Sequence, residues 1–234
     1  MGSNRNQMEF IDYLLKKSKN GMKKLPPIAV IAKDLGLSIP MVREYLAVAK
    51  QLGLINIQPR TGISILPYDF SPAISTSLYY AVQSEYAYFE QYSDLRNQIE
   101  KAYFIPAAKQ LLRNDIQGLL EIVDNALKQL QSNPIRIPHE EHKQFHLNIY
   151  KYLDNVFIDG ILNTYWDMYE LVGLNTYADF SYLEIVWKYH QDIAVAVADN
   201  KLSTAYTLLT DHIALLKSRE DVQRSSGDAT AKNK

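Results

Sequence analysis

The spacing of apolar residues changes once along the sequence, near a proline-containing stretch over residues 67–72. Before it, two short runs over 54–57 and 63–66 alternate apolar and polar residues, as half-buried β-strands do, and Pro59-Arg60-Thr61-Gly62 between them is typical of a turn. After it, apolar residues recur at the spacing of amphipathic helices. The sequence therefore predicts a mainly α fold with one small β-hairpin in its front part.

The helical patterns predict two domains and a tail. Three short helices precede the hairpin, and Ser38 is a favoured N-cap for the third of them. The rear part is predicted to be an all-helical bundle of six or seven helices. Its helical segments cover residues 72–91, 93–112, 114–131, 139–153, 155–174, 180–199 and 201–218. We expect one domain over residues 1–67, a second over 68–222, and a disordered Ser/Gly/Lys-rich tail over 223–234.

Charge is distributed unevenly between the two parts. Residues 1–66 hold ten basic and four acidic side chains, whereas the remainder is acidic overall. This indicates that only the front part meets a polyanion. The absence of cysteine excludes disulfides and thiolate metal sites in this chain. With no signal-peptide pattern and no apolar run near the roughly 20 residues that span a bilayer, we expect a cytoplasmic protein without membrane contact.

The front part has the pattern of a winged helix-turn-helix, which is two helices joined by a glycine-containing turn and followed by a hairpin. Ser38, Met41, Arg43 and Glu44 lie at the start of the third helix, where such domains meet base edges. At the hairpin, Arg60 and Thr61 are candidate contacts to the minor groove or to phosphate, and Gly62 allows a close backbone approach. The alternative is a small helical domain with a solvated basic face.

All five histidines follow residue 138. His142 and His146 are four residues apart, so they share one helix face. Such a pair is a common way to hold a transition metal, although a histidine on an apolar face is more often a hydrogen-bonded core residue. His190 and His212 lie on two later helical segments. The aromatic residues Tyr103, Tyr150, Tyr165, Trp166, Tyr169 and Trp187 are expected in the core.

Four segments of the front part resemble the N-terminal domain of GntR-family transcription regulators. They are Leu25-Pro26, then residues 32–38, then Val42-Arg43-Glu44-Tyr45-Leu46, then residues 52–55. The resemblance implies that Ser38, Arg43, Arg60 and Gly62 contact double-stranded operator DNA. Many relatives carry an arginine where this chain has Ala29 and Ile39. Base readout by those two arginines is therefore absent here.

Residues 88–216 resemble the helical effector (FCD) domain of the FadR subfamily within that family. The matching segments are Asp94 to Glu100 with Ala107-Ala108, then Phe145-His146 with Asn155, then the stretch from His190 to His212. In metal-binding members of the subfamily, the ligands are an aspartate and three histidines. Mapped onto this sequence, these positions are His142, His146, His190 and His212.

His142 stands where the family has its aspartate, so the site would offer four neutral imidazoles. That donor set favours Zn²⁺ or Ni²⁺ over Mn²⁺. Alternatively, the substitution marks a lapsed site, since some members bind ligands without metal. Effectors of the subfamily are mostly carboxylates or sugar acids. Arg96 is then either a second anchor for the effector or the partner of Glu100 in a helix-surface salt bridge.

Together these features predict a ligand-responsive regulator, more often a repressor in this family, that binds its operator as a homodimer and takes a small anionic effector. It is expected not to be an enzyme and to have no catalytic residue. Two alternatives stay open. One is a repressor for which the metal itself is the signal. The other is a metal-dependent hydrolase, for which Glu141 is the nearby candidate general base.

Overall fold

The computed structural model describes residues 2–175 and 179–215 of the chain. The chain divides into two compact units, Met1–Ser77 and Leu78–Lys234, and the division falls within helix α4 (Ser71–Ser84). Each unit is described by itself. The predicted disordered tail over 223–234 lies outside the described residues.

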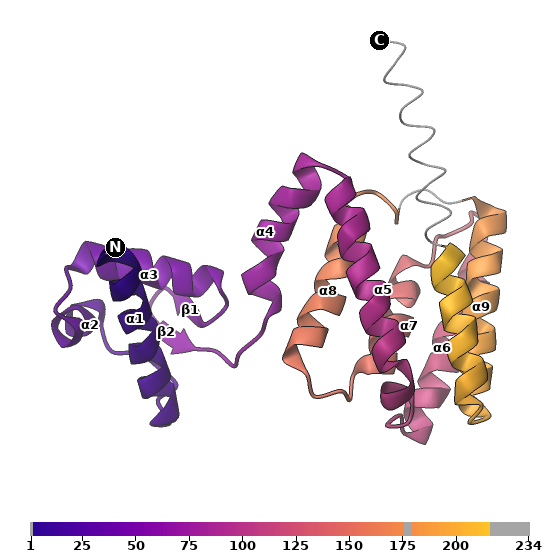
Figure 1. Cartoon of the computed structure of the whole chain (residues 1–234), viewed down its shortest axis with the longest axis horizontal. Coiled ribbons are helices and arrows are strands. Elements are labelled where there is room, and N and C mark those ends of the chain that lie inside the picture. Colours follow the sequence, from indigo (N-terminus) through magenta and orange to yellow (C-terminus); the bar gives the residue numbers. More distant parts are fainter. Residues whose placement is uncertain (1, 176–178, 216–234) are drawn as a thin grey trace, which may run out of the picture. The chain divides into compact units, whose positions relative to one another are not determined.

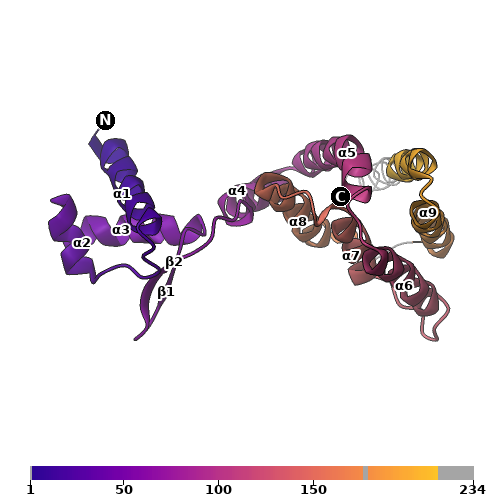
Figure 2. The same ribbon diagram turned by 90° about the horizontal axis from the view of Figure 1, so that it is seen from below.

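The first unit is a three-helix domain with a hairpin. Its elements are α1 (Gly2–Lys19), α2 (Ile28–Leu35), α3 (Ile39–Gln51), β1 (Ile55–Gln58) and β2 (Gly62–Ile65) (Figure 1). The two strands are antiparallel, with Ile55 opposite Ile65 and Gln58 opposite Gly62. Figure 2 shows the hairpin extending away from the three helices. This confirms the predicted winged helix-turn-helix with a small hairpin.

Local sequence signals explain the turn between α2 and α3. Gly36 ends α2 in the left-handed region with a φ of 64°, which is accessible to glycine at little cost. The hydroxyl of Ser38 then accepts a hydrogen bond from the Met41 N–H at 3.4 Å and caps α3, as predicted. Phe10, Val42 and Leu46 lie in the buried core between the helices. The core therefore holds α3 in place while its first turn stays at the surface.

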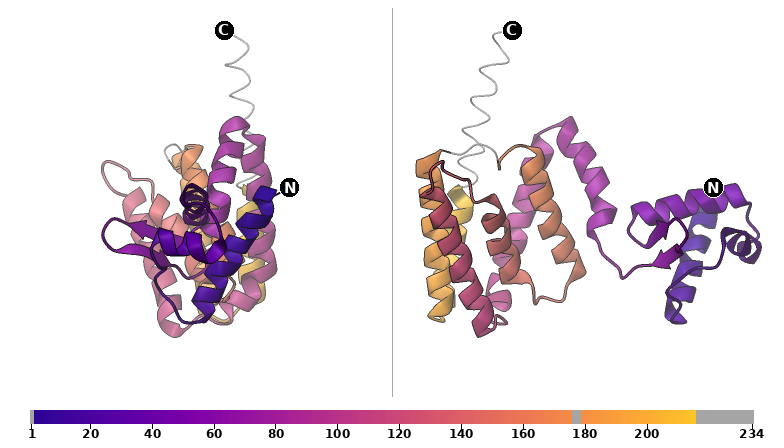
Figure 3. Two further views of the ribbon diagram at one scale, coloured as in Figure 1. Left: turned by 90° about the vertical axis from the view of Figure 1, so that its left-hand side faces the viewer. Right: turned by 180° about the vertical axis from the view of Figure 1, so that it is seen from behind.

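The second unit is an all-helical bundle, as predicted. It contains α5 (Ala87–Ala108), α6 (Arg113–Leu130), α7 (His139–Tyr150), α8 (Val156–Leu171), α9 (Phe180–Ala198) and a last helix described over 202–215. Helix α6 packs against α7 and α9, and α5 packs against α7 and α8. Figure 3 shows these helices from the side and from behind. No helix among the described residues has the length and apolar character needed to cross a membrane.

Two expectations about α4 and α5 were wrong. The break between them falls at Glu85 and Tyr86 and not near residue 92, and neither glycine nor proline marks it in the sequence. Tyr103 was expected in the core but is 39% exposed. It lies on the outer side of α5, whereas its neighbours Phe104 and Ala107 face the apolar core.

The junction after α3 generates a test of local packing. Gly53 has a φ of +72°, and a Cβ atom there would lie 2.7 Å from Cγ of the rigid Pro72 ring. Gly36 has a φ of +64° with nothing within 4 Å of such an atom. Gly36→Ala should destabilise the protein by about 1–2 kcal/mol through backbone strain alone. In urea unfolding, we expect Gly53→Ala to lower the free energy of unfolding by more than Gly36→Ala does. Equal decreases in the two variants would contradict the contact with Pro72.

Candidate metal centre and nucleic-acid interface

Four histidines from three helices meet inside the second unit. His142 and His146 lie on one face of α7, His190 lies on α9, and His212 lies in the last helix. Each offers a ring nitrogen, and these four nitrogens lie within 4.8 Å of one another. His142 is 8% exposed and the other three are fully buried. The structure thus brings together the four histidines predicted as ligands.

The spacing of the His146 and His190 ring nitrogens suits a common ion. Nε2 of His146 lies 3.2 Å from Nε2 of His190. Two nitrogens that bind the same ion, each at about 2.0–2.1 Å, lie about 2.9–3.4 Å apart when the angle between them at the ion is between 90° and the tetrahedral value. The same distance also suits a hydrogen bond between two neutral rings. The remaining nitrogens therefore decide whether the cluster fits a metal.

Several of those nitrogens have no partner. His142 Nε2, His190 Nδ1 and both ring nitrogens of His212 are buried and form no hydrogen bond with any described residue. A buried polar atom left unpaired costs about 1–3 kcal/mol. A metal ion would provide a partner for those nitrogens that carry a lone pair. The donor set of the cluster therefore fits a divalent transition metal.

Burial also sets the protonation state of the cluster. Desolvation lowers the pKa of all four rings well below the usual value near 6.5, and the positive charge of Arg96 lowers these pKa values further. The imidazoles are consequently neutral at neutral pH. Metal ligation requires this deprotonated form, so the cluster is ready for an ion without first losing protons.

A buried ion pair on α5 lies against the cluster. Arg96 and Glu100 are 0% and 1% exposed, and Nη2 of Arg96 lies 2.7 Å from Oε1 of Glu100. The guanidinium also lies over the ring of Tyr165, with Cζ 4.5 Å from its centroid. The salt bridge considered from the sequence is therefore present but lies in the interior and not on the helix surface. A role of Arg96 in binding an effector stays a prediction.

Sequence reasoning missed the contact that Glu100 makes with the histidine cluster. Its Oε1 lies 3.1 Å from Nδ1 of His146. Burial raises the pKa of Glu100 to about 7, against the opposing positive charge of Arg96. The four-residue spacing between Arg96 and Glu100 was visible in the sequence, but no local signal connects Glu100 with a histidine 46 residues later.

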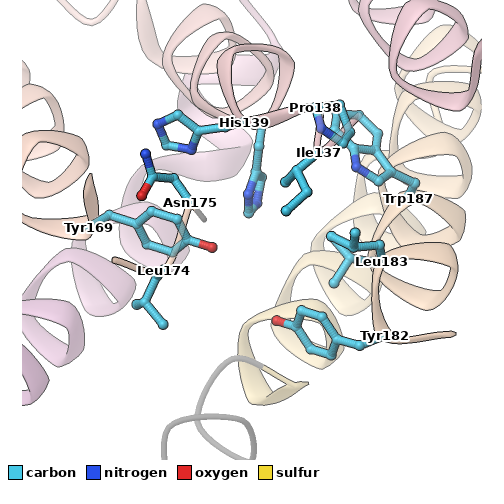
Figure 4. A pocket seen from close by; sticks show the side chains of 11 residues that line it. Ile137, Pro138, His139, Tyr169, Leu174, Asn175, Tyr182, Leu183 and Trp187 are labelled. Carbon is cyan, nitrogen blue, oxygen red and sulfur yellow. The ribbon is translucent and has the colours of Figure 1, made fainter. Parts of the chain in front are cut away.

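A small pocket lies beside His142, between the start of α7, the end of α8 and the start of α9. Figure 4 shows His139, Tyr169 and Asn175 on one side of it and Leu183 and Trp187 on the other. Its free volume of about 20 Å³ holds little more than one water molecule. The pocket gives the cluster a neighbouring space, but one smaller than an organic ligand.

The fifth histidine and Glu141 lie outside the cluster. The His139 ring stacks on Tyr169 with centroids 5.6 Å apart, and its Nε2 lies 2.9 Å from Oε1 of Glu170. Glu141, the candidate base of the hydrolase alternative, accepts a hydrogen bond from Gln129 on α6. Its carboxylate is therefore engaged with a neighbouring helix.

The predicted DNA contacts lie at two places on the first unit. Ser38 and Arg43 are exposed and Met41 is half-buried, all in the first turns of α3 or at its N-cap. Arg60, Thr61 and Gly62 are exposed at the end of the hairpin, where Arg60 has a φ of 68°. Ala29 and Ile39, at the two positions where the sequence resemblance led us to expect arginine, are also exposed. The structure leaves these positions accessible, and their DNA contacts stay a prediction.

Comparison with known proteins bears on both units. The model of the FCD domain family matches residues 91–215, which is more than half of the chain. No curated protein matches the chain in sequence. Among solved structures, Streptococcus agalactiae GntR is similar with a TM-score of 0.60 and 15% identity, over 93% of this chain and 99% of that one. This likeness confirms the predicted fold. E. coli McbR/YncC is similar with a TM-score of 0.48 and 16% identity, over 94% and 98% of the two chains.

Proposed function

Because the chain belongs to the FCD domain family, we propose that it is a ligand-responsive transcription regulator, with the first unit binding operator DNA and the second sensing a small anion. Family membership agrees with the resemblance to FadR-subfamily regulators found in the sequence. The observation that carries the proposal is the buried four-histidine cluster within the matched region, in a chain whose other unit is a winged helix-turn-helix.

The cluster would hold Zn²⁺ or Ni²⁺ through His142, His146, His190 and His212. Support comes from their neutral state, their unpartnered nitrogens and the absence of any thiolate in the chain. When bound, such an ion supplies a fixed positive charge that attracts a carboxylate. The residues of the bundle exclude water from it and orient the imidazoles.

The effector would be a small carboxylate or sugar acid that reaches the cluster through the pocket beside His142. Because that pocket holds little more than one water molecule, an effector of several atoms must displace side chains of α7, α8 or α9. Arg96 is the candidate second anchor, since its Nε has no hydrogen-bond partner in the described part of the chain. Effector binding would thus be coupled to the positions of helices.

On DNA, a homodimer would place two copies of α3 on the half-sites of a pseudo-palindromic operator. Each hairpin would bring Arg60 to the minor groove or the phosphates. The effector would change DNA affinity only through its different affinity for two arrangements of the dimer. Repression that the effector relieves is the mode we favour.

The metal site predicts different outcomes for two histidines. His146→Ala removes a ligand from the cluster, so the purified variant should lose stoichiometric zinc or nickel in elemental analysis. His139→Ala is the matched control, because its ring lies against Tyr169 outside the cluster. Stoichiometric metal retained by His146→Ala, or lost equally in both variants, would count against the site.

The DNA interface predicts losses at two exposed arginines. On duplexes selected from a random pool by the wild-type protein, Arg43→Ala should weaken binding by about 1–3 kcal/mol if it contacts a base edge. Arg60→Ala should lower the affinity for DNA of any sequence. It should also make DNA binding less dependent on salt, by the amount expected for the loss of about one phosphate contact. Lys109→Ala, exposed in the second unit, is the control and should bind normally. Normal binding by both arginine variants would refute this interface.

The responses of the protein to carboxylates, to zinc and to hydrolase substrates distinguish the proposal from its alternatives. We expect the affinity of zinc-loaded protein for a selected duplex to change when small carboxylates are added. Without carboxylate, metal-free and zinc-loaded protein should bind that duplex equally. A response to zinc alone would favour the metal-sensing repressor. Turnover of ester or amide substrates that His146→Ala abolishes would favour the hydrolase.

A further inference from the structure

Glu100 is a buried carboxylate that lies next to the histidine cluster without belonging to it. We infer that Glu100 positions His146 for metal binding and supplies a negative charge that stabilises the bound ion. This inference rests on the proposed metal site and adds to it a residue outside the ligand set. Glu100 acts through His146, so it is a positioning residue.

The geometry selects one form of the His146 ring. Glu100 Oε1 lies 3.1 Å from Nδ1, whereas Nε2 of the same ring faces Nε2 of His190 at 3.2 Å. The carboxylate form of Glu100 only accepts hydrogen bonds, so Nδ1 carries the proton when Glu100 is ionised, which is the form that a bound cation favours. Nε2 then keeps its lone pair, which points into the cluster. Carboxylates that bind the outer nitrogen of a metal-ligating histidine fix its tautomer and its orientation in this way.

Other contacts hold the Glu100 carboxylate in place. Nη2 of Arg96 lies 2.7 Å from the same Oε1, and both side chains are buried. The Tyr150 hydroxyl donates a hydrogen bond to the main-chain carbonyl of Glu100 at 3.0 Å, which links α5 to α7. Arg96 is itself packed over Tyr165. The hydrogen bond to His146 is therefore made by a group with little freedom to turn away.

Charge gives Glu100 its second role. The four imidazoles are uncharged donors, so a divalent ion would add two positive charges to an interior that already contains the Arg96 guanidinium. Interactions between charges are stronger in the interior than in water, because the effective dielectric constant is lower. Glu100 provides a compensating negative charge one hydrogen bond away from the ligand His146. Its removal should weaken metal binding without removing any ligand.

The test compares two carboxylate–histidine pairs. Glu100→Gln keeps the size of the side chain and a hydrogen-bond acceptor but removes the charge. Glu170→Gln is the matched control, because Glu170 pairs with His139 at 2.9 Å outside the cluster. In competition with a chelator, Zn²⁺ affinity should fall by about 10–100-fold in Glu100→Gln. The control should bind Zn²⁺ as the wild type does. Equal affinity in wild type and Glu100→Gln would overturn the role of the charge.

The orientation of His146 is measured on the wild-type protein, so a variant that fails to fold leaves the inference testable. In ¹⁵N NMR of the metal-free protein, at a pH where Glu100 is ionised, His146 should carry its proton on Nδ1. With Zn²⁺ bound, its Nε2 resonance should shift on coordination while Nδ1 stays protonated. A proton on Nε2, or zinc at Nδ1, would overturn the positioning role. Wild-type protein that binds no Zn²⁺ would overturn the proposed metal site and this inference together.

Discussion

Four uncharged imidazoles at one buried point determine how the bundle can pack. The i, i+4 spacing on α7 turns His142 and His146 inward together, and α9 and the last helix each bring one further ring to the same place. Most bundles fill such a point with apolar side chains that need no partners. Here each ring brings polar atoms whose burial is unfavourable unless they are bound. The positions of three helices therefore depend on what satisfies those nitrogens.

The ion pair on α5 extends this dependence to a fourth helix. Arg96 and Glu100 are charges in an interior that would exclude them singly, and each is tolerated because the other lies 2.7 Å away. Since Glu100 also contacts His146, α5 is joined to the cluster by a polar contact as well as by its apolar face. Binding or loss of an ion at the cluster would therefore affect α5 through this contact. Helices that are distant in sequence thus share one polar network.

The sequence predicted features that depend on local chemistry. Ser38 caps α3 and the residues around Gly62 form the hairpin because turn and cap residues act over a few positions. The approach of His190 and His212 to α7 came from the family resemblance, since no spacing rule links such distant residues. His139 shows the limit of periodicity: three residues before His142, it lines the same pocket, yet its Nε2 lies beside Glu170 and outside the cluster. The contact between Glu100 and His146 and the break at Glu85 had no local signal.

A cluster built from imidazoles alone, in a chain without cysteine, has a consequence for oxidative stress. Peroxide and disulfides attack thiolates, and zinc sites that contain cysteine release their metal when a ligand is oxidised to sulfenic acid or a disulfide. The cluster described here has no such ligand. Its occupancy by a redox-inert ion such as zinc would be independent of the thiol balance of the cell, so a metabolite signal read at this site would not be confused with an oxidant signal.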